Sequence, residues 1–351
     1  MSTPRLASAM LPGSLRWLTM ASAPWLIASS ATRYDWSTAD LSYLDGSPYR
    51  AEAAPSQALC RKLIDREPAA SERPSAAQAT ALKDCDSEAL LYGIGRPADP
   101  MAARQCAMLE RDSGSDKPNP YFTGPGILAV AYANGWGGPR DIERAIHMAC
   151  GIDDAPAATQ DRIANLSRLS NASGAKPFDI CADASSGASG GLCASHDARL
   201  QDQSRARTIA IWQRSWTASR RTAFDRAYAN MADYARTAHD LDCFRGTAAA
   251  ECTIRGTQKD LDRFLAKVGA LLGRNPPPPV PPIEARTNAA TAADRWAKQV
   301  AELDKDDRPD FQENGRKTVA ARARFERDLL AFAATIPGTT PHRTRQLFSD
   351  L

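Results

Sequence analysis

Apolar residues recur every three or four positions through the second half of the chain, which is the spacing of one face of an α-helix. The recurring positions are Ile209, Trp212 and Trp216; Phe224, Tyr228 and Met231; Leu261, Phe264, Leu265, Val268 and Leu272; Trp296, Val300 and Leu303; and Phe325, Leu329 and Phe332. Such stripes predict helix faces buried in a core, whereas the arginines interleaved with them, from Arg205 to Arg226, are expected in solvent. Because strand-forming Val and Ile are scarce and Ala is abundant, the sequence predicts an all-α fold.

Two stretches of the first half repeat each other at an offset of 42 residues. Residues 89–107 (ALLYGIGRPADPMAARQCA) align with residues 131–149 (AYANGWGGPRDIERAIHMA). The aligned pairs are Gly93 with Gly135, Gly95 with Gly137, Pro97 with Pro139, Asp99 with Asp141, Ala103 with Ala145 and Ala107 with Ala149. Glycine supplies the positive φ that a tight turn between helices requires, and an aspartate after the turn caps the next helix. The repeat therefore predicts two α/α hairpins.

The stretch AYANGWGGPRD, followed by an alanine-spaced helix, resembles the Sel1-like repeat, a relative of the tetratricopeptide repeat. The resemblance covers about residues 80–152 and implies an interaction scaffold, often extracytoplasmic and often disulfide-stapled. The chain departs from the family in having two recognisable units, whereas repeats generally need about three to bury a continuous core. We expect a repeat domain over residues 59–172, capped by a helix at residues 155–170; the alternative is a generic helical hairpin.

The chain has eight cysteines, an even number that favours disulfide pairing: Cys60, Cys85, Cys106, Cys150, Cys181, Cys193, Cys243 and Cys252. Cys181 and Cys193 can close a short loop, which would contribute about 3 kcal/mol by restricting the unfolded chain. Cys243 and Cys252 bracket another short connection, and Cys85 and Cys106 are further candidates. The four cysteines before residue 160 allow three pairings, which stay open. The alternatives are reduced thiols in a cytoplasmic protein and a metal pair of His147 with Cys150.

Residues 178–202 (FDICADASSGASGGLCASHDARLQD) resemble the N-terminal signature of the LprI-type lysozyme-inhibitor family in their cysteine spacing, their CADA start and their CAxxDARL continuation. The resemblance implies a disulfide-stapled helical domain over residues 178–275. A proline run at residues 276–282 predicts a semi-rigid spacer and a domain boundary. Beyond it, residues 283–351 are similar to a second, cysteine-free unit of the same type.

The N-terminal residues 1–31 have the features of a signal peptide. Arg5 and Arg16 precede a short apolar run at residues 17–28, and small residues follow it. The run is too short to span a bilayer, so no stable membrane span is expected. Residues 32–58 are expected to form a disordered leader, and the protein is expected in the periplasm or cell envelope of a bacterium. The alternatives are a disordered tail or a start at Met10.

The charge balance and the sequence motifs argue against nucleic-acid binding and against catalysis. Lys and Arg number 44 against 41 Asp and Glu, a net charge of +3, which argues against the concentrated basic face that nucleic-acid binding requires. The chain has no H-E-x-x-H motif and no phosphate-binding glycine loop. We therefore expect no enzyme, no metal and no cofactor.

An acidic segment at residues 302–313 (ELDKDDRPDFQE) offers Asp304, Asp306, Asp307 and Asp310 as candidate partner-binding residues. Common lysozymes are basic and use a carboxylate pair in a cleft, where such a loop could dock; the alternative is a solvated loop. The sequence thus predicts a non-catalytic, exported protein that occludes a lysozyme-like peptidoglycan hydrolase, as a lysozyme inhibitor or an immunity protein. The alternative is a cell-envelope scaffold or adaptor that binds a partner protein through the Sel1-like repeats.

Overall fold

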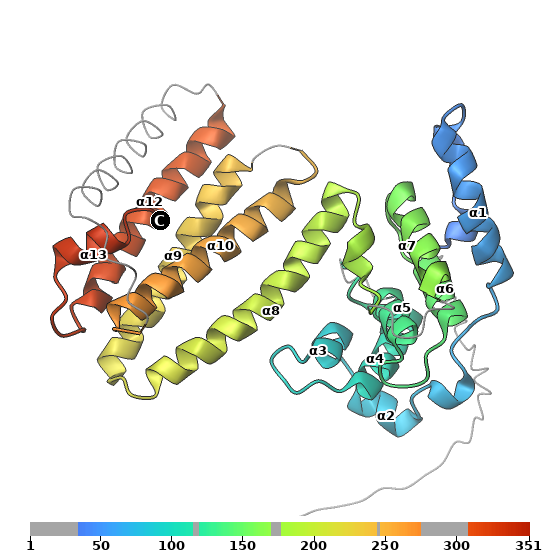
Figure 1. The fold of residues 1–351 in the computed structure, drawn as a ribbon, viewed down its shortest axis with the longest axis horizontal. Coiled ribbons are helices and arrows are strands. Elements are labelled where there is room, and N and C mark those ends of the chain that lie inside the picture. The colour runs from blue at the N-terminus through green and yellow to red at the C-terminus, as the bar shows by residue number, and fades with distance from the viewer. Residues whose placement is uncertain (1–33, 115–118, 170–176, 244–245, 275–307) are drawn as a thin grey trace, which may run out of the picture. The chain divides into compact units, whose positions relative to one another are not determined.

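The computed structural model describes residues 34–114, 119–169, 177–243, 246–274 and 308–351 (Figure 1). The all-α prediction is confirmed, because these residues form twelve α-helices and short 3-10 turns and contain no strand. The helices are α1 (Pro48–Lys62), α2 (Ala76–Ala81), α3 (Ser87–Tyr92), α4 (Pro100–Asp112), α5 (Gly124–Asn134), α6 (Ile142–Cys150), α7 (Pro156–Leu169), α8 (Gly187–Gln213), α9 (Ala218–Asp242), α10 (Ala249–Leu271), α12 (Pro309–Ala333) and α13 (Pro341–Leu347). None of these helices is both long enough and apolar enough to cross a membrane.

The helix pairs α3–α4 and α5–α6 share one turn geometry. Gly93 ends α3 and Gly135 ends α5, each in the left-handed conformation with φ +70°. The following amide, that of Ile94 or Trp136, donates to the carbonyl five residues earlier, at 3.0 and 2.9 Å. The left-handed conformation is unfavourable for residues that have a side chain but is readily adopted by glycine. The two glycines therefore end their helices in the same way.

The second helix of each pair begins in the same way too. The carboxylates of Asp99 and Asp141 accept hydrogen bonds from the amides of Ala102 and Arg144, each at 3.0 Å. Each aspartate also donates its own amide to a carbonyl nine residues earlier, at 2.8 and 3.0 Å. The side chain therefore caps the helix while the backbone ties the turn to the preceding helix.

The first core draws buried residues from α1, α3 to α7 and the start of α8, and it includes the chain that precedes the repeats. Trp36 is 1% exposed, and its indole nitrogen donates to Ser56 Oγ on α1 at 2.8 Å. Leu41 and Ala53 join the same cluster. The predicted disordered leader is therefore wrong for residues 34–58, because Trp36 and Leu41 are buried in this core and residues 48–58 belong to α1.

The second core combines the C-terminal half of α8 with α9, α10, α12 and α13. The ring of Phe224 on α9 lies 5.3 Å from that of Phe332 on α12 and 6.3 Å from that of Phe264 on α10. The predicted separate C-terminal domain is therefore wrong for residues 308–351, whose apolar face completes the core of the preceding helices. Trp296, Val300 and Leu303, like the signal peptide at residues 1–31 and the proline run at residues 276–282, lie outside the described residues.

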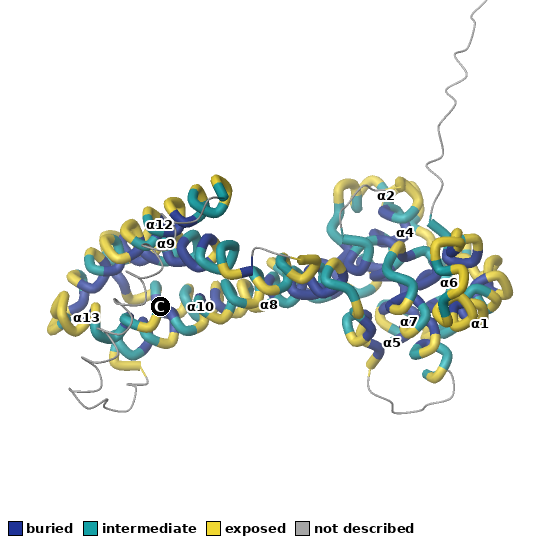
Figure 2. Tube along the Cα trace, turned by 90° about the horizontal axis from the view of Figure 1, so that it is seen from above, coloured by how far each residue is buried: buried dark blue, intermediate teal, exposed yellow. Residues whose placement is uncertain are grey.

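The long helix α8 contributes to both cores, so the predicted domain boundary at residue 178 does not separate them. Cys193 near its start belongs to the first core and Trp212 near its end to the second; Figure 2 colours the buried residues dark blue. The apolar stripes on α8, α9, α10 and α12 belong to the core, as expected, but Arg205 is only 4% exposed. It is not the solvated arginine that the sequence predicts, because Asp202 and Asp262 pair with its guanidinium.

Candidate functional site

All eight cysteines form disulfides, as their even number predicts. The pairs are Cys60–Cys150, Cys85–Cys106, Cys181–Cys193 and Cys243–Cys252, with Cα–Cα distances of 5.9, 6.0, 5.8 and 5.7 Å. The tertiary structure thus selects one of the three pairings that the first four cysteines allow. Disulfides persist in oxidising compartments, which indicates a protein outside the cytoplasm.

The cysteines offer no thiolate to a metal. The alternative of a metal pair at His147 and Cys150 does not fit, because the Cys150 sulfur is bonded to Cys60 and His147 Nε2 lies 3.1 Å from Glu67. Arg111 and then His147 hold the pKa of Glu67 at about 2, well below the usual value for glutamate. Glu67 is therefore an ionised partner of Arg111, and its carboxylate also lies against the His147 ring.

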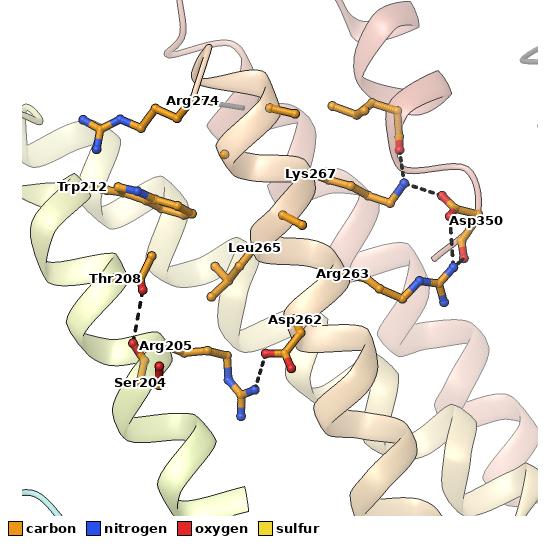
Figure 3. A pocket seen from close by; sticks show the side chains of 14 residues that line it. Ser204, Arg205, Thr208, Trp212, Asp262, Arg263, Leu265, Lys267, Arg274 and Asp350 are labelled. Atoms are coloured by element: carbon orange, nitrogen blue, oxygen red, sulfur yellow. Dashed lines mark hydrogen bonds and ion pairs between the residues drawn. The ribbon is translucent and has the colours of Figure 1, made fainter. Parts of the chain in front are cut away.

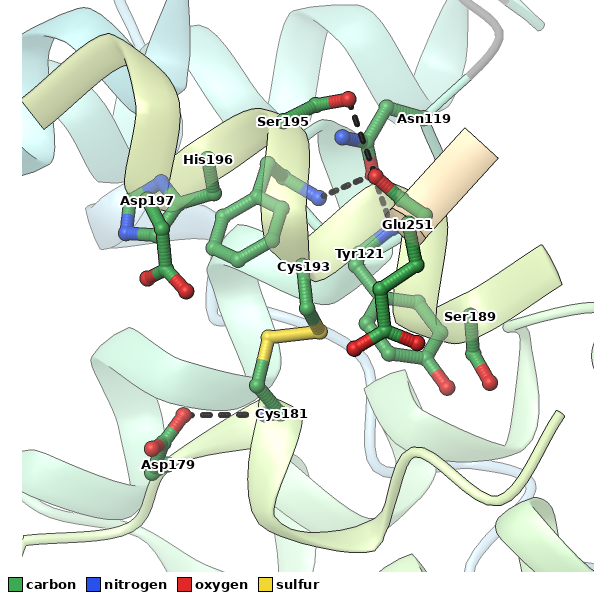
Figure 4. Close-up of a disulfide and its surroundings, with 12 residues drawn as sticks. Asn119, Tyr121, Asp179, Cys181, Ser189, Cys193, Ser195, His196, Asp197 and Glu251 are labelled. Carbon is green, nitrogen blue, oxygen red and sulfur yellow. Dashed lines mark hydrogen bonds between the residues drawn. A yellow bond between two sulfur atoms is a disulfide. The ribbon is translucent and has the colours of Figure 1, made fainter. Parts of the chain in front are cut away.

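The bridge between Cys181 and Cys193 holds the start of α8 (Figure 4). Asp179 accepts a hydrogen bond from the Cys181 amide at 2.9 Å, and Ser186 caps α8 through the Ser189 amide at 3.0 Å. The capped turn and the bridge together fix where the helix begins.

The small residues between these two cysteines lie against the beginning of α10. A Cβ on Gly190 would lie 2.9 Å from the carboxyl carbon of Glu251, and one on Gly187 would overlap the carbonyl of Thr247. The small-residue segment is therefore a close-packed surface between α8 and α10 rather than an open loop that could enter another protein's cleft.

A buried polar cluster joins α3 to α8. His196 Nδ1 lies 2.6 Å from Glu88 Oε1, and its ring stacks on Phe122 with centroids 3.9 Å apart. Arg199 pairs with both Glu88 and Asp86. Since Cys193 is disulfide-bonded, His196 has no thiol to activate, and the cluster acts as an ion-paired link between two helices.

Exposed apolar side chains gather where the two hairpins turn. Met101 is 63% exposed and Trp136 36% exposed, although both are large. The backbone brings them together, because a Cβ on Gly137 would lie 2.8 Å from the Met101 amide nitrogen. Arg96, in the first turn, is also exposed and has no ion pair among the described residues. We call Arg96, Met101 and Trp136 the turn patch.

Sequence reasoning did not single out the turn patch. The signal available was the repeat itself, because Ile94 and Trp136 occupy equivalent positions, each between two glycines of a turn. The Trp136 ring meets Tyr92 of α3 edge-on, with centroids 6.2 Å apart, and 36% of the surface of Trp136 is exposed.

Of the four predicted acidic partner-binding residues, the structure describes Asp310 alone. Asp310 lies in the first turn of α12, where a carboxylate favours the helix N-terminus. Asp304, Asp306 and Asp307 lie outside the described residues.

A second pair of a histidine and a carboxylate lies between α9 and α10. His239 Nε2 lies 2.9 Å from Asp260 Oδ2, and this hydrogen bond raises the pKa of His239. Burial alone would raise the pKa of Asp260, but the bonds from His239 and Arg263 lower it. Gly256 gives the imidazole its room, since a Cβ there would lie 2.6 Å from ring atoms of His239.

Protein-family models, curated proteins and solved structures were each compared with the chain, and none matches it.

Proposed function

We propose that this chain is a disulfide-stapled, extracytoplasmic binding protein that inhibits a lysozyme-like peptidoglycan hydrolase without performing chemistry of its own. The target class comes from the resemblance of residues 178–202 to the LprI-type signature. The location comes from four disulfides that use every cysteine of the chain.

The proposal rests on the turn patch, part of which lies on a hairpin closed by a disulfide. Cys85 precedes α3 and Cys106 lies within α4, so their bridge holds closed the hairpin that presents Arg96 and Met101. A hairpin backbone held in place before binding loses little conformational entropy on association, which favours a tight complex.

The turn patch has the chemistry of an occluding element. Trp136 and Met101 offer large apolar contact area, and tryptophan is enriched among the residues that dominate binding energy. Lysozyme-type hydrolases hold a catalytic carboxylate pair in a cleft, to which the exposed guanidinium of Arg96 is complementary in charge. In this mechanism the patch enters the cleft and excludes the glycan.

The test is a titration of the purified, oxidised protein against a panel of lysozyme-type muramidases, with clearing of a peptidoglycan suspension as the readout. We expect stoichiometric inhibition that is lost on reduction of the disulfides. The paired change Met101→Ser and Trp136→Ser should weaken inhibition by about tenfold or more. Ile211→Ser is the matched control, because Ile211 is 54% exposed on α8 and lies outside the patch. Absence of inhibition by the folded, oxidised protein across the panel would refute the proposal.

The second candidate is a cell-envelope scaffold whose hairpins hold a partner that is not a hydrolase. The shared geometry of the two turns favours it, because repeated hairpins commonly build binding surfaces. Capture of a partner that requires Trp136 and Met101, together with no effect on any muramidase, would select the scaffold.

A further inference from the structure

A cavity of about 810 Å³ lies between α8, α10 and the C-terminal residues that follow α13 (Figure 3). Its volume falls within the roughly 300–1,000 Å³ that small-molecule sites occupy. The cavity is remote in sequence from the turn patch, so binding of a ligand there does not depend on the proposed function.

The floor of the cavity is apolar and includes an aromatic ring. Trp212 and Leu265 line it from the two helices, next to Ala270. A Cβ on Gly269 would lie 3.7 Å from the indole, so the α10 backbone runs close to Trp212, of which 9% is exposed. Aromatic and aliphatic lining with a few polar groups is typical of sites for small organic ligands.

The polar lining carries more cations than acids. Arg205, Arg263, Lys267 and Arg274 face two carboxylates, Asp262 and Asp350. Asp262 forms an ion pair with Arg205 at 2.6 Å. Asp350 forms ion pairs with Lys267 at 2.5 Å and with Arg263 at 3.0 Å. Beyond the lining, Asp202 and Asp260 add further partners to Arg205 and Arg263.

Arg274 is the remaining cation of the lining. It is exposed, it follows the end of α10, and it has no ion pair among the described residues. Arg274 and Trp212 both line the cavity, and both are labelled in Figure 3. A guanidinium and an aromatic ring that line one cavity suit a ligand that has an anionic head and an apolar body.

We propose that this cavity binds a small organic carboxylate, with the carboxylate on Arg274 and the apolar body on Trp212 and Leu265. Lys267 lies on the same lining, but Asp350 already pairs with it and with Arg263, so Arg274 is the main contact for the carboxylate of the ligand. The body of the ligand is either a flat ring or a short alkyl chain, and the experiment distinguishes the two.

The test is calorimetric titration of the full chain with octanoate and with indole-3-acetate. We expect saturable, one-to-one binding of at least one of them, and the tighter of the two identifies the body that the cavity accepts. Octylamine has the same number of carbon atoms as octanoate and the opposite charge, and it should not bind. Arg274→Ala should weaken binding by about tenfold, and the affinity of the unaltered chain should fall with rising salt.

Matched variants distinguish binding in the cavity from binding elsewhere on the surface. Arg207→Ala removes an exposed arginine of α8 that does not line the cavity, and should leave affinity unchanged. Ala266→Trp fills the cavity from an exposed lining position and should abolish binding, whereas Ala210→Trp, exposed on α8, should not. Far-UV circular dichroism checks that each variant is folded. No saturable binding of either carboxylate, equal binding of octylamine, or equal affinities of Arg274→Ala and Arg207→Ala would overturn the proposal.

Discussion

Gly137, in the second hairpin turn, lies against the carbonyl oxygen of Pro100 at the start of α4, with no room for a side chain between them. The turn of one repeat unit therefore sits directly on the second helix of the other. Gly95 occupies the equivalent position in the first unit and also has a positive φ, +70° against +74°, but nothing lies within 4 Å of its missing Cβ.

This contrast makes a matched pair of variants. Gly95→Ala should cost about 1–2 kcal/mol of unfolding free energy, because it forces an L side chain into the left-handed region. Gly137→Ala should cost about 3 kcal/mol or more, because it adds a backbone overlap to the same conformational penalty. Urea unfolding of both variants measures the difference, and equal losses would show that the two turns are not packed as described.

The disulfides should differ in their contribution to stability. Replacing Cys60 and Cys150 by serine opens a loop with a sequence separation of 90, whereas replacing Cys181 and Cys193 opens one of 12. Loop-closure entropy then predicts losses of about 4–5 and about 3 kcal/mol, respectively. Thermal and urea unfolding of the two double variants gives the comparison. A larger loss for the short loop would indicate that native packing at the start of α8, not chain entropy, sets the contribution.

Stability should depend on pH through His239. Its hydrogen bond to Asp260 raises the pKa of the folded-state imidazole above its ordinary 6.5. The folded protein therefore binds this proton more tightly than the unfolded chain does, and the stabilisation is complete below about pH 6.5. It is lost as the pH rises through the raised pKa.

His239→Gln should lower stability at pH 6 and flatten its decline above that pH, which unfolding curves measured from pH 5 to 9 would show. His342→Gln is the control, since His342 is exposed on α13 and should leave the profile as it is. An unchanged profile in His239→Gln would show that the pair between His239 and Asp260 is not the source.

The second core should require α12. Phe332→Ala removes a fully buried ring that contacts Phe224 and Trp216, and should cost about 3–5 kcal/mol. Arg327→Ala, on the exposed side of the same helix, should stay within about 0.5 kcal/mol of the unaltered protein. A chain cleaved after Arg274 should keep its two fragments together in gel filtration. Separation of the fragments would contradict a shared core.

Much of the local structure could be predicted from the sequence, because it depends on short-range chemistry. The 3.6-residue spacing of apolar positions such as Phe224 and Tyr228 indicates helices without reference to any partner. The same holds for Gly93 and Asp99, since a left-handed glycine and a capping aspartate act within one turn of their own helix. The even number of cysteines likewise predicted pairing without identifying every pair.

The tertiary structure alone decided what depends on which surfaces meet. Periodicity marks the apolar face of α12 but cannot say that it closes the core containing Phe264 rather than a core of its own. Trp36 lies in a segment of polar composition, and its burial depends on the site that α1 provides. Cys60 and Cys150 are far apart in the chain, so their bridge follows from the packing of α1 against α6. The exposure of Trp136 has the same origin, because burial is a property of neighbours that only the folded chain brings together.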